Sequence, residues 1–201
     1  MFDYKKQNDW QPDGNYLQSP VDIKDDNVKI LHQLIPFAIV DQIEITKIEN
    51  TGNNIKYSGI GKAMIFGHKY NFQQLHFHHP AEHLINGKAA DFEIHFVFTN
   101  EIGQMIVVAI LLNVGEDSPF VQQLIEQKLF NPQLKIPTAV SGYHYLGSLT
   151  NPPLIPGVEW LIVTDPILSI GKEQLEWFKQ HFAENARDVQ PMQNRTIEKF
   201  E

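Results

Sequence analysis

The 201-residue sequence contains no cysteine. It therefore has no disulfide framework, no thiolate metal site and no cysteine nucleophile. Any metal chemistry must use histidine, aspartate or glutamate as ligands. Basic residues are also in the minority, since 16 Lys and Arg stand against 24 Asp and Glu and leave a formal net charge of -8. Nucleic acid is not an expected partner, because such a surface repels its phosphates.

Long apolar runs are lacking as well. No stretch approaches the ~18 apolar residues of a membrane span, and residues 1–11 lack the apolar core of a secretory signal. The sequence thus predicts no membrane association and a cytoplasmic location. A periplasmic or secreted location is the alternative if a signal peptide has been removed.

The residues that are present suit a single domain covering residues 1–201. Of these residues 42% are hydrophobic, and the 12 Pro and 12 Gly are spread out without a linker or a repeat. Amphipathic patterns predict helices at 119–129 and 172–182. The runs rich in β-forming residues are 37–48, 54–60, 63–78, 91–100, 105–115 and 157–170. We expect an α+β, mostly β fold, with a mostly antiparallel sheet and a few short peripheral helices.

Histidines gather in the segment QQLHFHHPAEH, residues 73–83, which holds four of the nine in the chain. Side chains two residues apart on a strand share a face of the sheet. Gln74, His76 and His78 therefore point one way, and the apolar residues between them point the other. Two imidazoles lie side by side as a result.

A second candidate strand, DFEIHFVF at residues 91–98, carries Glu93 and His95 on one face and aromatic and aliphatic residues on the other. Turn signals, including Asn86-Gly87, separate it from the first segment. If the two strands pair, His95 reaches the same point in space as the two imidazoles before it.

Three neutral imidazoles converging from rigid strands, with no fourth protein ligand, form the open tetrahedral arrangement of a catalytic zinc site. Gln74 and Glu93 each lie two residues before a histidine, where they can accept the second N–H of a metal-bound ring. The alternative is that these histidines are packed or solvated residues, as a lone histidine on a strand more often is. The third histidine on a second strand favours the metal site.

Six segments in order and in register resemble an α-class carbonic anhydrase of the bacterial type. The resemblance covers nearly the whole chain and implies a central twisted, largely antiparallel sheet of about ten strands with zinc at the base of a conical cleft. It also implies a zinc lyase that reversibly hydrates carbon dioxide to bicarbonate and a proton, through attack of zinc-bound hydroxide. The segments are QSPVDI (18–23), LHFHHPAEH (75–83), INGKAADFEIHFVF (85–98), GSLTNPP (147–153), GVEW (157–160) and NARDVQP (185–191).

The resemblance assigns roles to individual residues. His76, His78 and His95 match the zinc ligands of the family. Glu82 matches its buried glutamate, and Thr150 matches the threonine whose hydroxyl donates to that glutamate and accepts from zinc-bound hydroxide. Sulfonamides are expected to bind the zinc as anions, with their N–H facing Thr150.

Carbon dioxide has no charge or dipole to bind, so its site needs an apolar wall. The positions that match the apolar substrate pocket of the family are Val97, Val107, Leu149, Val158 and Trp160. Taken singly, each of these residues is as well explained as ordinary core.

The chain departs from the family at the position of the proton-shuttle histidine, which is Asn53 here. Asparagine cannot titrate, so we expect turnover to be limited by proton transfer and raised by small imidazole-type buffers. His68, His79 and His83 are candidates for a substitute, although a structural role suits each of them better. The cysteine pair common in exported bacterial members is missing too, which favours the cytoplasm.

Two other functions remain open at this point. His76-X-His78 followed by Glu82 also fits the start of a cupin motif, with the glutamate as a fourth ligand to iron or manganese, although no second motif follows. A non-catalytic binding module on the carbonic anhydrase fold is the other alternative. For the enzyme we expect a small-molecule substrate and a monomer or homodimer.

Overall fold

A ten-stranded sheet dominates the computed structural model, which describes residues 2–12, 17–132 and 137–201. Its strands are β2 (Lys29–Leu31), β3 (Ile35–Asn50), β4 (Ile55–Ile65), β5 (His68–His78), β8 (Phe92–Thr99), β9 (Met105–Leu112), β11 (Ala139–Val140), β12 (Gly142–Ser148), β13 (Pro156–Val163) and β15 (Glu198–Phe200). Their order across the sheet is β11-β3-β4-β5-β8-β9-β13-β12-β15-β2. Neighbours are antiparallel except for the pairs β9–β13 and β15–β2. The predicted mostly β fold with a large, largely antiparallel sheet is confirmed.

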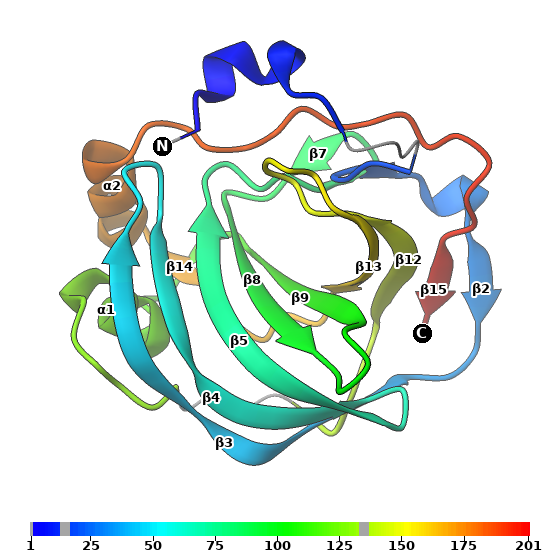
Figure 1. The fold of residues 1–201 in the computed structure, drawn as a ribbon, viewed down its shortest axis with the longest axis horizontal. Helices are drawn as coiled ribbons and strands as arrows, with labels where there is room; N and C mark the ends of the chain where they lie inside the picture. Colours follow the sequence, from blue (N-terminus) through cyan, green and yellow to red (C-terminus); the bar gives the residue numbers. More distant parts are fainter. Residues whose placement is uncertain (1, 13–16, 133–136) are drawn as a thin grey trace.

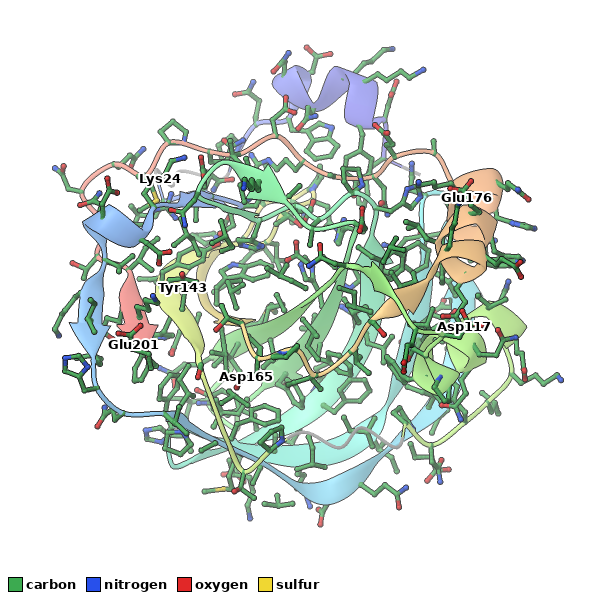
Figure 2. The ribbon with its side chains drawn as sticks, turned by 180° about the vertical axis from the view of Figure 1, so that it is seen from behind. Lys24, Asp117, Tyr143, Asp165, Glu176 and Glu201 are labelled. Atoms are coloured by element: carbon green, nitrogen blue, oxygen red, sulfur yellow. The ribbon has the colours of Figure 1, made fainter. Side chains whose placement is uncertain are left out.

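Short elements surround this sheet. The helices α1 (Pro119–Glu126) and α2 (Lys172–His181) pack together on one side of it (Figure 1), and Asp117 and Glu176 lie at that end in the view from behind (Figure 2). Tyr143 and Glu201 lie at the opposite end. The remaining elements are η1 (Tyr4–Asp9), β1 (Asp22–Ile23), η2 (Asp25–Asn27), β6 (Leu84–Ile85), β7 (Lys88–Ala89), β10 (Val114–Gly115) and β14 (Ile170–Gly171). Among the described residues, no helix combines the length and the apolar character that crossing a bilayer requires.

The prediction of one strand over residues 63–78 is wrong, because the chain turns at Phe66 and Gly67, both with positive φ. β4 instead continues through Gly59 and Gly61 to Ile65. These two glycines lie where the pairing of β3 with β4 shifts register, and a Cβ at Gly59 would overlap the carbonyl oxygen of β3 residue Glu44. They therefore mark a close approach of two backbones rather than the end of a strand.

Other predicted boundaries also move. The expected strand 157–170 ends at Val163 and is followed by Asp165-Pro166, because proline cannot donate to a sheet ladder. Both predicted helices are present, but α1 ends at Glu126, where Gln127 takes a left-handed conformation. β12 was not among the predicted strands.

The central strands are buried on both faces and separate two apolar clusters. Phe92, Ile94, Phe96 and Phe98 of β8 belong to the larger cluster, which also receives α1 and α2. The alternate residue Val97 belongs to the smaller cluster, with Val107, Ala109, Tyr145, Trp160 and Ile162. The predicted alternation along β8 is thus confirmed, and it directs Glu93 and His95 to the face of the smaller cluster.

Candidate metal centre

The pairing of β5 with β8 brings the predicted ligands together. The two strands are antiparallel, with His76 opposite His95 and His78 opposite Glu93. One nitrogen from each of the three histidines lies within 4.8 Å of those of the other two. His78 and His95 are buried, and His76 is partly buried. The strand pairing that the sequence argument assumed is present, and it brings the three imidazoles together.

Hydrogen bonds fix the tautomers of the two histidines on β5. His76 Nδ1–H donates to Gln74 Oε1 at 2.9 Å, as the spacing of these residues predicts. His78 Nδ1–H donates to the backbone carbonyl of Asn185 at 2.8 Å. A carbonyl can only accept, so Nδ1 of His78 must carry the proton. Both rings therefore turn an unprotonated Nε2 toward the centre.

His95 is held in the opposite tautomer by Glu93. Its Nε2–H donates to Glu93 Oε1 at 2.7 Å, which leaves Nδ1 unprotonated. The same carboxylate accepts from the Nδ1–H of His83 at 2.7 Å, and His83 Nε2 lies 2.7 Å from the Tyr145 hydroxyl. His83, Glu93 and His95 also have ligand atoms close to one another. Because both nitrogens of His83 are engaged in hydrogen bonds, we interpret this group as support for His95 rather than as a second metal site.

Three lone pairs therefore face one another with no proton between them. His95 Nδ1 and His76 Nε2 are 3.3 Å apart, and His78 Nε2 is buried with no hydrogen-bond partner in the described part of the chain. Burial lowers the pKa of all three imidazoles, that of His78 to about 4, so the rings stay neutral at pH 7. Neutral, converging nitrogen lone pairs repel one another unless a cation lies between them. This donor set fits a metal ion.

Glu82 lies beside the three histidines but outside their cluster. Its Oε1 accepts from the backbone N–H of Arg187 at 2.9 Å and lies 3.3 Å from His78 Nδ1, the ring nitrogen that turns away from the centre. Burial raises the pKa of Glu82 to about 7, and the Thr150 hydroxyl beside it acts in the opposite direction. The cupin hypothesis needs this carboxylate as a fourth ligand, and the geometry does not place it there.

A cavity of about 150 Å³ adjoins the imidazoles, and its lining combines apolar side chains with the polar Gln74, His76, His95, Thr150 and Asn151. Four of the five predicted pocket residues line it: Val97, Val107, Leu149 and Trp160. Val158 does not, because it is fully buried in the smaller cluster. Met105 of β9, which is paired with Val158 of β13, lines the cavity instead. The two-residue spacing of Met105 from Val107 is the signal that could have found it.

A second cavity, of about 320 Å³, shares Gln74, His76 and Asn151 with the first. It is also lined by Phe2, Tyr4 and Lys56, and by Asn53, the residue at the predicted proton-shuttle position. Asn53 Oδ1 accepts from the backbone N–H of Phe2 at 2.8 Å. Because they share lining residues, the two cavities adjoin. The first, or inner, cavity is lined by buried and half-buried side chains, whereas the second, or outer, cavity is bordered by the exposed Phe2, Thr51 and Lys56 and forms the mouth. We call the two cavities together the cleft.

The three histidines considered as substitute shuttles lie elsewhere. His83 is buried between Glu93 and Tyr145. His79 borders a different cavity beside α2, and His68 is exposed at the start of β5. None of the three is among the residues that line the cleft.

Comparisons with known proteins agree with this geometry. The model of the family described as eukaryotic-type carbonic anhydrase matches residues 5–201. A carbonic anhydrase from Nostoc sp. is 29% identical, over 90% of this chain and 74% of the relative. The solved α-carbonic anhydrase of Photobacterium profundum is 27% identical with a TM-score of 0.80, covering 90% of this chain and 88% of the other. That of Thermovibrio ammonificans, in complex with the inhibitor sulfanilamide, is 30% identical with a TM-score of 0.78, covering 90% and 86%.

Proposed function

Because the chain belongs to the eukaryotic-type, or α-class, carbonic anhydrase family, we propose that it catalyses the reversible hydration of carbon dioxide to bicarbonate and a proton. His76, His78 and His95 would hold the zinc ion on which this activity depends. The observation that carries the proposal is the convergence of three unprotonated imidazole nitrogens, each fixed by an acceptor on its far side.

Zinc suits this donor set, since catalytic zinc sites use three protein ligands and keep a fourth position open. When bound, zinc supplies a Lewis acid that lowers the pKa of a coordinated water, an effect for which carbonic anhydrases are the standard example. The protein contributes the rigidity of the site, because two of the ligands come from β5 and the third from the strand paired with it. The acceptors Gln74, Glu93 and Asn185 keep each ring in the orientation that zinc requires.

Thr150 and Glu82 supply orientation next to the metal centre. The backbone N–H of Arg187 occupies Glu82 Oε1, while Oε2 is buried without a partner in the described residues. We infer that the Thr150 hydroxyl donates to this free oxygen. A hydroxyl that gives its only proton to Glu82 can only accept a hydrogen bond through its oxygen. Thr150 would therefore favour a zinc ligand that carries an N–H or O–H. By accepting that hydrogen bond, it would turn the lone pairs of the ligand toward the substrate.

The apolar lining would hold carbon dioxide itself. Val97, Val107, Leu149 and Trp160 cover one side of the inner cavity and offer no hydrogen bond from their hydrocarbon surfaces. The Trp160 indole N–H donates to the backbone carbonyl of Ser148, so it does not point a free donor at the substrate. An uncharged linear molecule is therefore held by van der Waals contact with this wall, and a competing water molecule finds no hydrogen-bond partner on it.

The test combines metal content with stopped-flow carbon dioxide hydration. We expect about one zinc per chain, loss of activity on chelation and recovery when zinc is restored. His95→Ala should lose both zinc and activity, whereas Lys62→Gln, on exposed β4 surface, should keep both. A folded, zinc-loaded protein with no hydration activity would refute the proposal and favour a binding module on this fold.

A further inference from the structure

One fixed positive charge lines the mouth of the cleft. Lys56, at the start of β4, borders the outer cavity together with Gln74 and His76. Among the described residues, the side chains that line the two cavities include no Asp, Glu or Arg and no second Lys. This cation is thus isolated in a cleft of otherwise neutral groups, on a chain whose formal net charge is -8.

The sheet register places Lys56 next to a metal ligand. Tyr57 pairs with Leu75 across β4 and β5, and both side chains are buried in the larger apolar cluster on the far face. Lys56 precedes Tyr57 on β4 and His76 follows Leu75 on β5, so both point to the opposite face of the sheet. They are therefore neighbours across the two strands on the side of the cleft. Asn54 ties this end of β4 to β5, since its side chain donates to the Phe77 carbonyl and accepts from the Phe77 N–H. In Figure 1 the turn between β3 and β4 lies on the same side of the molecule as η1.

Lys56 forms no ion pair in the described residues, although its charge is one of the weaker causes that lower the pKa of Glu49. Its cross-strand neighbour on β3 is Glu49, which instead forms an ion pair with Lys47 at 2.8 Å. The other polar groups around the outer cavity, among them Tyr4 and Asn53, are neutral hydroxyls and amides.

We propose that Lys56 gives the cleft a preference for anions and so determines which ligands of the metal centre bind best. The proposal rests on the function proposed above. It applies to bicarbonate and to inhibitors that combine a metal-binding head with an anionic tail. A charge at the mouth of a cleft with low-dielectric walls attracts or repels the charged groups of ligands that extend to its position. At a separation of about 7 Å and an effective dielectric constant of about 60, one unit charge changes affinity about fourfold.

The experiment uses three sulfonamides with one metal-binding head and different tails. They are benzenesulfonamide, its 4-carboxy derivative and its 4-aminomethyl derivative, and their dissociation constants are measured on the zinc-loaded protein by calorimetry. In the unaltered protein the anionic tail should bind roughly tenfold more tightly than the cationic tail, because the two charges act in opposite directions. Lys56→Gln should reduce that ratio to about one, and Lys56→Glu should invert it. The parent compound has no charged tail, so its affinity reports only the effect of each variant on the shared metal-binding head, which cancels in the ratio.

Lys62→Gln is the matched control, since it removes the same charge from β4 at a site that does not line the cleft. It should leave the ratio unchanged, and added salt should reduce the ratio in the unaltered protein. Thermal unfolding of each variant checks that the fold is kept. A ratio near one in the unaltered protein, or equal effects of Lys56→Gln and Lys62→Gln, overturns the role of Lys56 while the proposed function stands. If none of the three sulfonamides binds the zinc-loaded protein, the proposed function fails and this proposal fails with it.

Discussion

Glu93 is the residue whose replacement tests the metal centre most sharply. Its buried carboxylate accepts four N–H groups and has no Lys or Arg partner in the described chain. Oε2 accepts from the backbone N–H groups of Glu82 and His83 at 2.7 and 2.9 Å. Oε1 accepts from the rings of His83 and His95, each at 2.7 Å. Glu93→Gln keeps the shape of this side chain but replaces one acceptor oxygen with an NH₂ group.

The magnitude follows from these contacts. The NH₂ group faces two donors in either orientation of the amide, so two charge-assisted hydrogen bonds are lost. At about 1.5–3 kcal/mol for each, the free energy of unfolding should fall by about 3 to 6 kcal/mol. In a domain of this size that loss corresponds to a lower Tm by about 6 to 24 °C. His95 also loses the acceptor that fixes its tautomer, so zinc affinity should fall by about 10- to 100-fold.

The assay is zinc affinity from competition with a chromophoric chelator, together with calorimetric Tm values with and without zinc. Gln74→Ala is the comparison, because it removes a neutral acceptor from His76 at a site that borders the cleft, where water can replace it. Its effect on zinc affinity should be smaller, since hydrogen bonds to a charged group are about twice as strong. Zinc affinity of Glu93→Gln within about threefold of the unaltered protein would refute the role of this carboxylate in holding His95.

Three further predictions concern the cavity, proton transfer and pH. Val107→Phe should fill much of the inner cavity of about 150 Å³ and lower kcat/KM for carbon dioxide on the order of 100-fold, with zinc content unchanged; normal stopped-flow rates would contradict the assigned pocket. Asn53→His should raise turnover at low buffer at least about tenfold and weaken its dependence on added imidazole, measured by stopped flow; the same buffer dependence in both proteins would refute this. The pKa of His78, lowered to about 4 by burial, means that the unfolded chain binds a proton below pH ~6.5 that the folded chain does not. The contribution of this histidine to the free energy of unfolding of the metal-free protein, measured with urea, should therefore fall by about 3 kcal/mol as pH falls from ~6.5 to ~4. His78→Gln should flatten the dependence of that free energy on pH, and equal slopes in the two proteins would contradict the prediction.

The clustering of the three histidines could be predicted from the sequence, because a strand has a side-chain period of two. That period puts His76 and His78 on one face, and it predicts Gln74 as the supporting neighbour of His76 and Glu93 as that of His95. A single pairing, His76 with His95, then completes the cluster. No long-range information was needed beyond the assumption that the two strands are adjacent.

Contacts between distant segments could not be predicted in this way. The carbonyl that holds His78 belongs to Asn185, 107 positions further along the chain, and a backbone oxygen leaves no signature in the sequence. The burial of Val158 likewise depends on the parallel pairing of β13 with β9. The predicted break after residue 60 is wrong, because a glycine such as Gly61 serves equally well in a turn and where two backbones approach closely.

The link from His78 and Glu82 to the segment around Asn185 and Arg187 also sets an order of events during synthesis. The histidines leave the ribosome long before residues 185–187, yet the carbonyl and the N–H that orient His78 and Glu82 arrive only with those late residues. A nascent chain therefore carries all three histidines before it can orient His78. The arrangement proposed to hold zinc is complete only when the last part of the domain has folded.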